Sequence, residues 1–240
     1  TEQRLSTLAE LWMQEALAVT PKSKPGQAPE LSPAALDAWL ETARYSYAYL
    51  FFSGRTPAQR ALEDRLTQVR DYYNYATEQA SSVVFQRSKA RALEGEDLTK
   101  PVQVDRWTIR SEFDQLNLTG IPSQLVAASS VSFAGLRSSY RRDGFGAELV
   151  VVLEKAPLAV PVEGEGGPSL PVFSEMPAIN ATTLLYFSGD TLEEVLATRD
   201  IRLEAYSPDL TSTIMLRGQE VPLAANFTAA YGVWLAQSGF

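Results

Sequence analysis

The chain has 240 residues, of which 45% are hydrophobic, and its 29 acidic and 21 basic side chains give a formal net charge of −8. It contains no cysteine, which excludes disulfides, thiolate nucleophiles and cysteine-ligated metals. It contains no histidine either, so this chain alone has no imidazole base and cannot assemble a Ser-His-Asp triad. We expect a folded protein without a metal or other cofactor.

The charge is unevenly distributed along the chain. Residues 1–142 carry 17 basic and 16 acidic groups, whereas residues 143–240 carry 4 basic and 13 acidic groups. An acidic surface repels nucleic-acid phosphates, so no nucleic-acid partner is expected. The longest aliphatic run, Leu149–Leu153, is far shorter than the about 20 residues of a membrane-spanning helix. Because the chain begins at Thr1, we expect a processed or trimmed polypeptide, from which any signal peptide or lipid-bearing first residue would have been removed.

The first predicted element is a helix over residues 4–19, where apolar side chains recur on one face. Residues 20–32 contain three prolines and a glycine and are predicted to form a linker. Ser32 and Pro33 then suit an N-cap and the first turn of a second helix.

A helical hairpin is the clearest pattern in the sequence. Apolar residues in 36–50 and 62–83 are spaced alternately four and three apart, as in packed helices, and the second helix is expected to end near residue 93. Residues 53–57 contain the glycine and proline of a helix-to-helix turn. We therefore predict a helical domain, residues 1–94, built as an antiparallel hairpin within a three-helix bundle.

The hairpin is rich in aromatic residues, which suit either a bundle core or a lipid-binding groove. We expect the core, because tyrosine rings commonly pack inside a bundle and leave their hydroxyls near water. The residues concerned are Tyr45, Tyr47, Tyr49, Phe51, Phe52, Tyr72, Tyr73 and Tyr75.

The remaining residues, 95–240, are predicted to form a second, β-rich unit. Residues 102–109 alternate apolar and polar side chains, with a bulge expected at Asp105-Arg106. Further strands are predicted at 147–153, 182–187, 200–206 and 211–217, the last two joined by a turn at 207–209. The fold class is therefore α+β, with a mostly antiparallel sheet.

Two more helices are predicted in this unit. Asp190-Thr191-Leu192-Glu193 resembles a capping box that opens a short helix ending at Ala197. Residues 223–236 form a terminal helix that is apolar on most faces and should be buried. It either docks on a following domain or partner, or packs on the acidic sheet. Between the strands, the glycine- and proline-rich residues 161–171 are predicted to be a surface loop.

Few residues offer recognisable chemistry. The sequence has no G-x-S-x-G, P-loop or G-x-G-x-x-G motif. Residues 143–146 (DGFG) precede a strand rather than open a helix, so they do not suit a nucleotide. The carboxylate pairs Glu96-Asp97, Glu163/Glu165 and Glu193-Glu194 lie in predicted turns or on a short polar helix, where solvated surface groups are expected.

One polar cluster and one apolar helix supply the candidate site residues. Two adjacent arginines beside an aspartate either grip a carboxylate or phosphate, or form an ordinary charged turn. The terminal helix contributes aromatic residues to a ligand site or an interface. The candidates are Tyr140, Arg141, Arg142 and Asp143 in the cluster, and Phe227, Tyr231 and Trp234 in the helix.

Several segments together resemble a known family. Residues 44–52 (RYSYAYLFF), 71–80 (DYYNYATEQA), 135–150 (GLRSSYRRDGFGAELV), 185–208 (LYFSGDTLEEVLATRDIRLEAYSP) and 221–240 (VPLAANFTAAYGVWLAQSGF) carry the likeness. They resemble the N-terminal, pre-catalytic region of exported bacterial α/β-hydrolases, which are often lipoproteins. The likeness begins near residue 36 and contains no catalytic motif.

The resemblance implies an esterase, lipase or phospholipase as the parent protein, located in the periplasm or at the outer membrane. The triad residues would then lie beyond Phe240, and no catalytic residue is carried over to this chain. The leading hypothesis is a non-catalytic accessory domain that packs on an α/β-hydrolase catalytic domain and shapes substrate access, with a removed lipid anchor as a further link to the membrane. The alternative is a self-standing exported binding protein. A carboxylate-dependent hydrolase is a third, weaker hypothesis.

Overall fold

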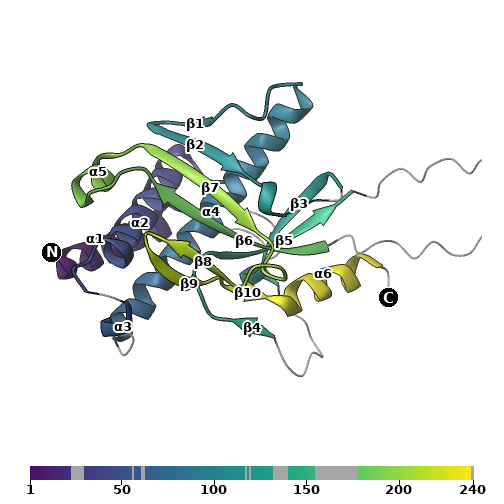
Figure 1. Cartoon of the computed structure of the whole chain (residues 1–240). Helices are drawn as coiled ribbons and strands as arrows, with labels where there is room; N and C mark the ends of the chain where they lie inside the picture. Colours follow the sequence, from purple (N-terminus) through teal and green to yellow (C-terminus); the bar gives the residue numbers. More distant parts are fainter. Residues whose placement is uncertain are drawn as a thin grey trace, which may run out of the picture.

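The computed structural model describes residues 1–22, 30–55, 57–60, 63–116, 118, 120–131, 140–154 and 178–238. It is an α+β fold with helices at the N-terminus, a curled and mostly antiparallel sheet, and a C-terminal helix, which confirms the predicted fold class (Figure 1). The predicted loop at 161–171 and the pair Glu163/Glu165 lie outside the described residues.

The N-terminal helices follow the sequence pattern closely. They are α1 (Glu2–Val19), α2 (Pro33–Phe51), the single-turn α3 (Pro57–Arg60) and α4 (Asp64–Leu93). Ser32 caps α2 as predicted, because its hydroxyl accepts a hydrogen bond from the backbone N–H of Ala35 at 3.2 Å. The indole N–H of Trp39 donates to the Thr20 hydroxyl at 2.9 Å, which joins the end of α1 to the beginning of α2.

The main sheet of the described residues has six strands in the order β1-β2-β7-β6-β5-β3. Neighbouring strands are antiparallel except β2 and β7, which are parallel. The strands are β1 (Val102–Val104), β2 (Trp107–Glu112), β3 (Pro122–Ala127), β5 (Ala147–Leu153), β6 (Ala178–Phe187) and β7 (Asp200–Tyr206).

Smaller elements surround this sheet. Two short strands, β4 (Arg141–Arg142) and β10 (Ala225–Asn226), pair with each other, and β8 (Thr213–Leu216) pairs with β9 (Gln219–Pro222). The remaining elements are the 3₁₀ turns η1 (Asp114–Leu116) and η2 (Ala128–Ser130) and the helices α5 (Leu192–Ala197) and α6 (Phe227–Ser238). A capping box opens α5 one residue later than predicted, with Thr191 as the N-cap and Glu194 as its partner in place of Asp190 and Glu193.

Two local predictions are wrong, and a third is confirmed with shorter bounds. The expected bulge at Asp105-Arg106 is a tight turn between β1 and β2, in which Asp105 has a φ of 51°. The expected strand 211–217 is present as β8 (Thr213–Leu216), which pairs with β9. The terminal helix begins at Phe227 rather than 223, because residues 225–226 pair with β4.

Helices and sheet share one hydrophobic core. A single buried cluster contains residues of α1, α2 and α4 together with residues of β1, β2, β6 and β7. The Tyr73 hydroxyl fixes α4 to β6, since it donates to the carbonyl of Leu185 at 2.8 Å and accepts from its N–H at 3.0 Å. The hairpin tyrosines Tyr47, Tyr49 and Tyr73 are 2% exposed or less, which supports the core interpretation of the aromatic pattern.

Helix α6 packs on the sheet with one face. Its Ala229, Ala230 and Val233 are buried against a cluster of small apolar residues from β3, β5 and β6. The sequence left open whether this helix packs on the sheet or docks on a following domain or partner. One face of α6 packs on the sheet, whereas Tyr231 on the same helix is 48% exposed. No helix among the described residues is long and apolar enough to cross a membrane.

Candidate functional site

The predicted candidate residues are brought together around β4 and α6 (Figure 1). Arg141 pairs with Asn226 and Arg142 with Ala225, so β4 is tied to the strand that leads directly into α6. The backbone N–H of Phe227 also donates to the carbonyl of Tyr140 at 3.0 Å. Two segments more than 80 residues apart in the sequence thus form one local structure.

The two adjacent arginines have different surroundings. Arg142 is half-buried and donates to three backbone carbonyls, of Leu223 at 2.8 Å, Pro208 at 3.2 Å and Thr211 at 3.3 Å. Arg141 is exposed and pairs with Glu148 at 2.9 Å. Arg142 therefore ties the chain together here, and the two guanidinium groups do not converge on a common ligand position.

Aromatic residues gather on this region, and its helix α6 is uncharged. The rings of Tyr231 and Trp234 stack with centroids 5.8 Å apart, and the side chain of Tyr140 is 72% exposed. Helix α6 (FTAAYGVWLAQS) has no charged residue, although the half of the chain that contains it is strongly acidic. We call Tyr140, Phe227, Tyr231 and Trp234 the β4–α6 surface. Asp143, the remaining candidate, is exposed beside it.

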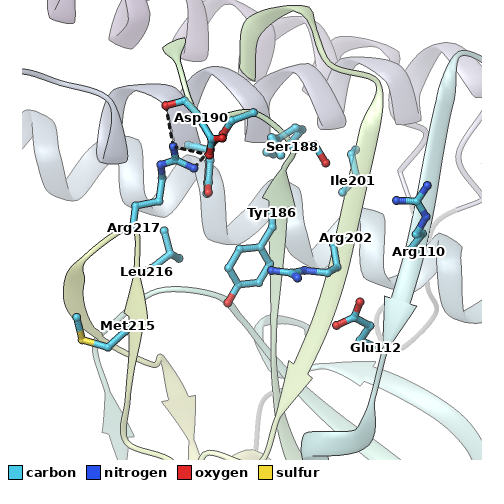
Figure 2. A pocket seen from close by; sticks show the side chains of 13 residues that line it. Arg110, Glu112, Tyr186, Ser188, Asp190, Ile201, Arg202, Met215, Leu216 and Arg217 are labelled. Atoms are coloured by element: carbon cyan, nitrogen blue, oxygen red, sulfur yellow. Dashed lines mark hydrogen bonds and ion pairs between the residues drawn. The ribbon is translucent and has the colours of Figure 1, made fainter. Parts of the chain in front are cut away.

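A second feature is a cavity of about 630 Å³ between β2, β7, β6 and the β8–β9 hairpin (Figure 2). Its lining is polar and charged around a small apolar base. The lining residues are Tyr47, Arg110, Glu112, Tyr186, Phe187, Ser188, Gly189, Asp190, Ile201, Arg202, Met215, Leu216 and Arg217. Apart from Tyr47, the sequence analysis singled out none of these as a site residue.

Like charges lie side by side in this cavity because a short sequence repeats on parallel strands. Ile-Arg-x-Glu occurs at 109–112 in β2 and again at 201–204 in β7, and the two copies pair in register. Arg110 is therefore opposite Arg202, and Glu112 is opposite Glu204. The repeat is visible in the sequence, but its meaning depends on the strands being parallel neighbours.

Arg217 forms the opposite wall of the cavity (Figure 2). It donates to the carbonyls of Gly189 and Asp190, both at 3.0 Å, and its guanidinium group lies 4.0 Å from the centre of the Phe52 ring. These contacts hold the β8–β9 hairpin against the loop that follows β6. The wall is thereby fixed by contacts within the chain.

Two tyrosines extend the polar network at the cavity. The hydroxyls of Tyr186 and Tyr206 lie 3.0 Å apart, and Tyr206 donates to the carboxylate of Glu204. Burial raises the pKa of both hydroxyls, and burial together with the bond to Glu204 raises the pKa of Tyr206 to about 12. Both groups are therefore neutral near pH 7 and serve as hydrogen-bonding groups rather than as bases.

The described carboxylate pairs from the sequence analysis, Glu96-Asp97 and Glu193-Glu194, are exposed surface groups, as expected. Asp97 accepts from Thr99 in an exposed turn, and Glu194 caps α5. Glu78, which the sequence analysis did not single out, is buried beneath η2, where the Ser129 hydroxyl lies 2.9 Å from both of its carboxylate oxygens. Within the described part of the chain, no three Asp or Glu residues are placed to hold a metal ion.

Comparison with known proteins adds no assignment: no protein-family model, no curated protein and no solved structure matches this chain. The β4–α6 surface and the cavity are therefore the two features on which a functional proposal rests.

Proposed function

We propose that this chain is a non-catalytic accessory domain of an exported bacterial α/β-hydrolase of the serine esterase, lipase or phospholipase type. It packs on the catalytic domain and shapes the access of substrate. Its proposed location is the periplasm or the outer membrane, and a removed lipid anchor is a further proposed link to the membrane. The complete absence of histidine supports a non-catalytic role in serine-hydrolase chemistry, because the triad needs an imidazole.

The observation that carries this proposal is the character of α6. One face of the helix is fixed on the sheet through Ala229, Ala230 and Val233, so the helix does not depend on a partner to be held. Tyr231, which is 48% exposed, stacks on the half-buried Trp234, whose ring also packs against the sheet, and α6 carries no charged residue. Protein interfaces are enriched in aromatic residues and depleted of charge at their centre. The β4–α6 surface thus supports docking of the catalytic domain.

A fluorophosphonate probe, which labels activated serine nucleophiles, tests the non-catalytic part of the proposal. The purified 240-residue chain is expected to remain unlabelled under conditions in which a serine esterase, included as the positive control, is labelled completely. Stoichiometric labelling of a serine of this chain would contradict the accessory role.

The cavity favours a second candidate function, that of a self-standing exported binding protein. A volume of about 630 Å³ is in the range of sites for small molecules. The two candidate functions differ in whether a hydrolase is required. A binding protein binds its ligand when purified alone, whereas an accessory domain acts only together with a hydrolase. Saturable binding at the cavity in the isolated chain, without any association with a hydrolase, would favour the second candidate.

A further inference from the structure

The cavity contains two arginines that are only partly engaged by other groups of the chain. Among the described residues, Arg110 and Arg202 each have a single carboxylate partner. Arg110 has one ion-pair contact, 3.9 Å from Asp200, and its side chain is 61% exposed. The Nε of Arg202 lies 2.8 Å from Glu204, its side chain is 48% exposed, and its guanidinium group covers the Tyr186 ring at 4.8 Å. Both side chains line the cavity.

The pairing register places these two cations next to each other. Arg110 and Arg202 are directly opposite on parallel strands, whose spacing is about 4.8 Å, and like charges in this position destabilise a sheet. The Arg202 guanidinium group now lies over the Tyr186 ring, on the side away from Arg110 (Figure 2). Both side chains are long and exposed, so a change of rotamer would let the two guanidinium groups reach one group between them. An oxyanion there would remove the repulsion and accept several charge-assisted hydrogen bonds.

From this arrangement we propose that the cavity is a binding site for a small soluble molecule bearing a phosphate group, held between Arg110 and Arg202. A dianionic phosphate matches two guanidinium groups in charge and in the number of acceptor oxygens. Figure 2 shows Arg110 and Arg202 on neighbouring strands above Glu112.

The acidic residues of the cavity define the rest of the ligand. Glu112 lies two residues beyond Arg110 on β2, or about 6.6 Å along the strand, and Asp190 lines the rim. Carboxylates accept hydrogen bonds but do not donate them, so they favour hydroxyl or amine groups on the part of the ligand away from the phosphate. They also disfavour an extended anionic surface such as a membrane of acidic lipids. The ligand class is therefore a soluble hydroxylated or aminated phosphate monoester.

Binding of a phosphate group at the cavity does not depend on docking of a hydrolase at the β4–α6 surface. If phosphate fails to bind, the proposed complex with a hydrolase is unaffected. If that complex is not found, phosphate binding still stands. The two outcomes are measured separately.

The experiment is a titration of the intact chain with inorganic phosphate at pH 8, followed by the backbone amide signals of β2 and β7 at an ionic strength kept constant with chloride. We expect saturable shifts localised at the cavity. Arg110→Gln and Arg202→Gln should each weaken binding at least about tenfold, because each removes one charged bidentate donor. Arg110→Lys should be intermediate, and Glu112→Gln should tighten binding by removing a repulsive charge.

Arg4→Gln is the matched control, because Arg4 is an exposed arginine on α1, outside the cavity. Shifts that do not saturate, or that are equally weakened by Arg4→Gln, would overturn the proposal. A parallel titration compares phosphatidylcholine vesicles with and without phosphatidic acid. Binding to the phosphatidic acid vesicles without binding to free phosphate would overturn the assignment to a soluble ligand.

Discussion

Arg141 and Arg142 are adjacent in the sequence and differ sharply in how they contribute to stability. Arg142 satisfies the carbonyls of Leu223, Pro208 and Thr211, three groups from two separate segments, and its guanidinium group also lies 5.7 Å from the centre of the Phe227 ring. Arg141 makes one ion pair at the surface, with Glu148. Charged hydrogen bonds to buried acceptors contribute far more to folding than exposed ion pairs do.

We therefore expect Arg142→Ala to lower the free energy of unfolding by about 2–3 kcal/mol, whereas Arg141→Ala should lower it by less than about 1 kcal/mol. Urea denaturation followed by circular dichroism measures both. Equal losses in the two variants would show that the carbonyl contacts of Arg142 contribute little.

Glu78 is a buried carboxyl group whose protonation is coupled to folding. Burial is the main cause that raises its pKa from 4.5 to about 7, nearby Glu148 adds to the rise, and the bond from Ser129 opposes it. The folded state thus holds this proton in a pH range where the unfolded chain has released it. The stabilising contribution is complete below about pH 4.5 and is lost as the pH rises through about 7.

Glu78→Gln removes this titration while it keeps the shape of the side chain. The free energy of unfolding of the variant, relative to the parent chain, should increase between pH 5 and pH 8 by an amount on the order of 2 kcal/mol. Glu94→Gln, at an exposed position after α4, is the control and should give a constant difference. A difference for Glu78→Gln that does not vary with pH would contradict the coupling.

At the scale of elements, a close contact with residues 222–224 explains why residue 144, shortly before β5, is a glycine. Phe145 donates to the carbonyl of Pro222 at 2.8 Å and accepts from Ala224 at 2.9 Å, which brings residues 222–224 directly over Gly144. A Cβ at Gly144 would lie 2.4 Å from the carbonyl oxygen of Pro222. The DGFG sequence thus lies against residues 222–224, and its Phe145 forms a parallel β-bridge with Leu223.

Gly144→Ala should therefore destabilise the protein by at least about 2 kcal/mol, because the atoms it meets belong to the backbone and cannot move aside. Gly54→Ala provides the comparison, since a Cβ there meets nothing within 4 Å, and it should change stability by less than about 0.5 kcal/mol. Thermal unfolding of both variants is the measurement. A neutral Gly144→Ala would mean that residues 222–224 are not held against this turn.

The elements that the sequence predicted well are those with strong local signals. The spacing of apolar residues located α2 and α4, and Ser32 located the beginning of α2. The strand predicted at 211–217 is present as β8, but the alternation of its residues identifies a strand without identifying its partner, β9. For the same reason, the cavity was missed: Arg110 and Arg202 are 92 residues apart, and the parallel pairing of β2 with β7 brings them together.

On the scale of the whole molecule, a continuous core supports two outward-facing features. The buried cluster that contains Trp39 of α2 and Trp107 of β2 joins the helices to the sheet. The cavity and the β4–α6 surface are both built on this sheet, and the contacts that hold them come from within the chain. The fold therefore presents preformed surfaces, which suits a protein that acts by binding.

The central claim is that the β4–α6 surface docks a serine hydrolase, and site-specific photocrosslinking tests it most directly. The residue Tyr231 is replaced by p-benzoylphenylalanine, and the same replacement at Leu93, an 83% exposed residue at the end of α4, is the control. After irradiation in cells of the source organism, the Tyr231 variant should be joined to a polypeptide that reacts with a fluorophosphonate probe, and the Leu93 variant should not. Docking of a serine hydrolase at the β4–α6 surface would be contradicted if the crosslinked products of the Tyr231 variant did not react with the fluorophosphonate probe. It would also be contradicted if the Tyr231 and Leu93 variants were crosslinked to the same extent.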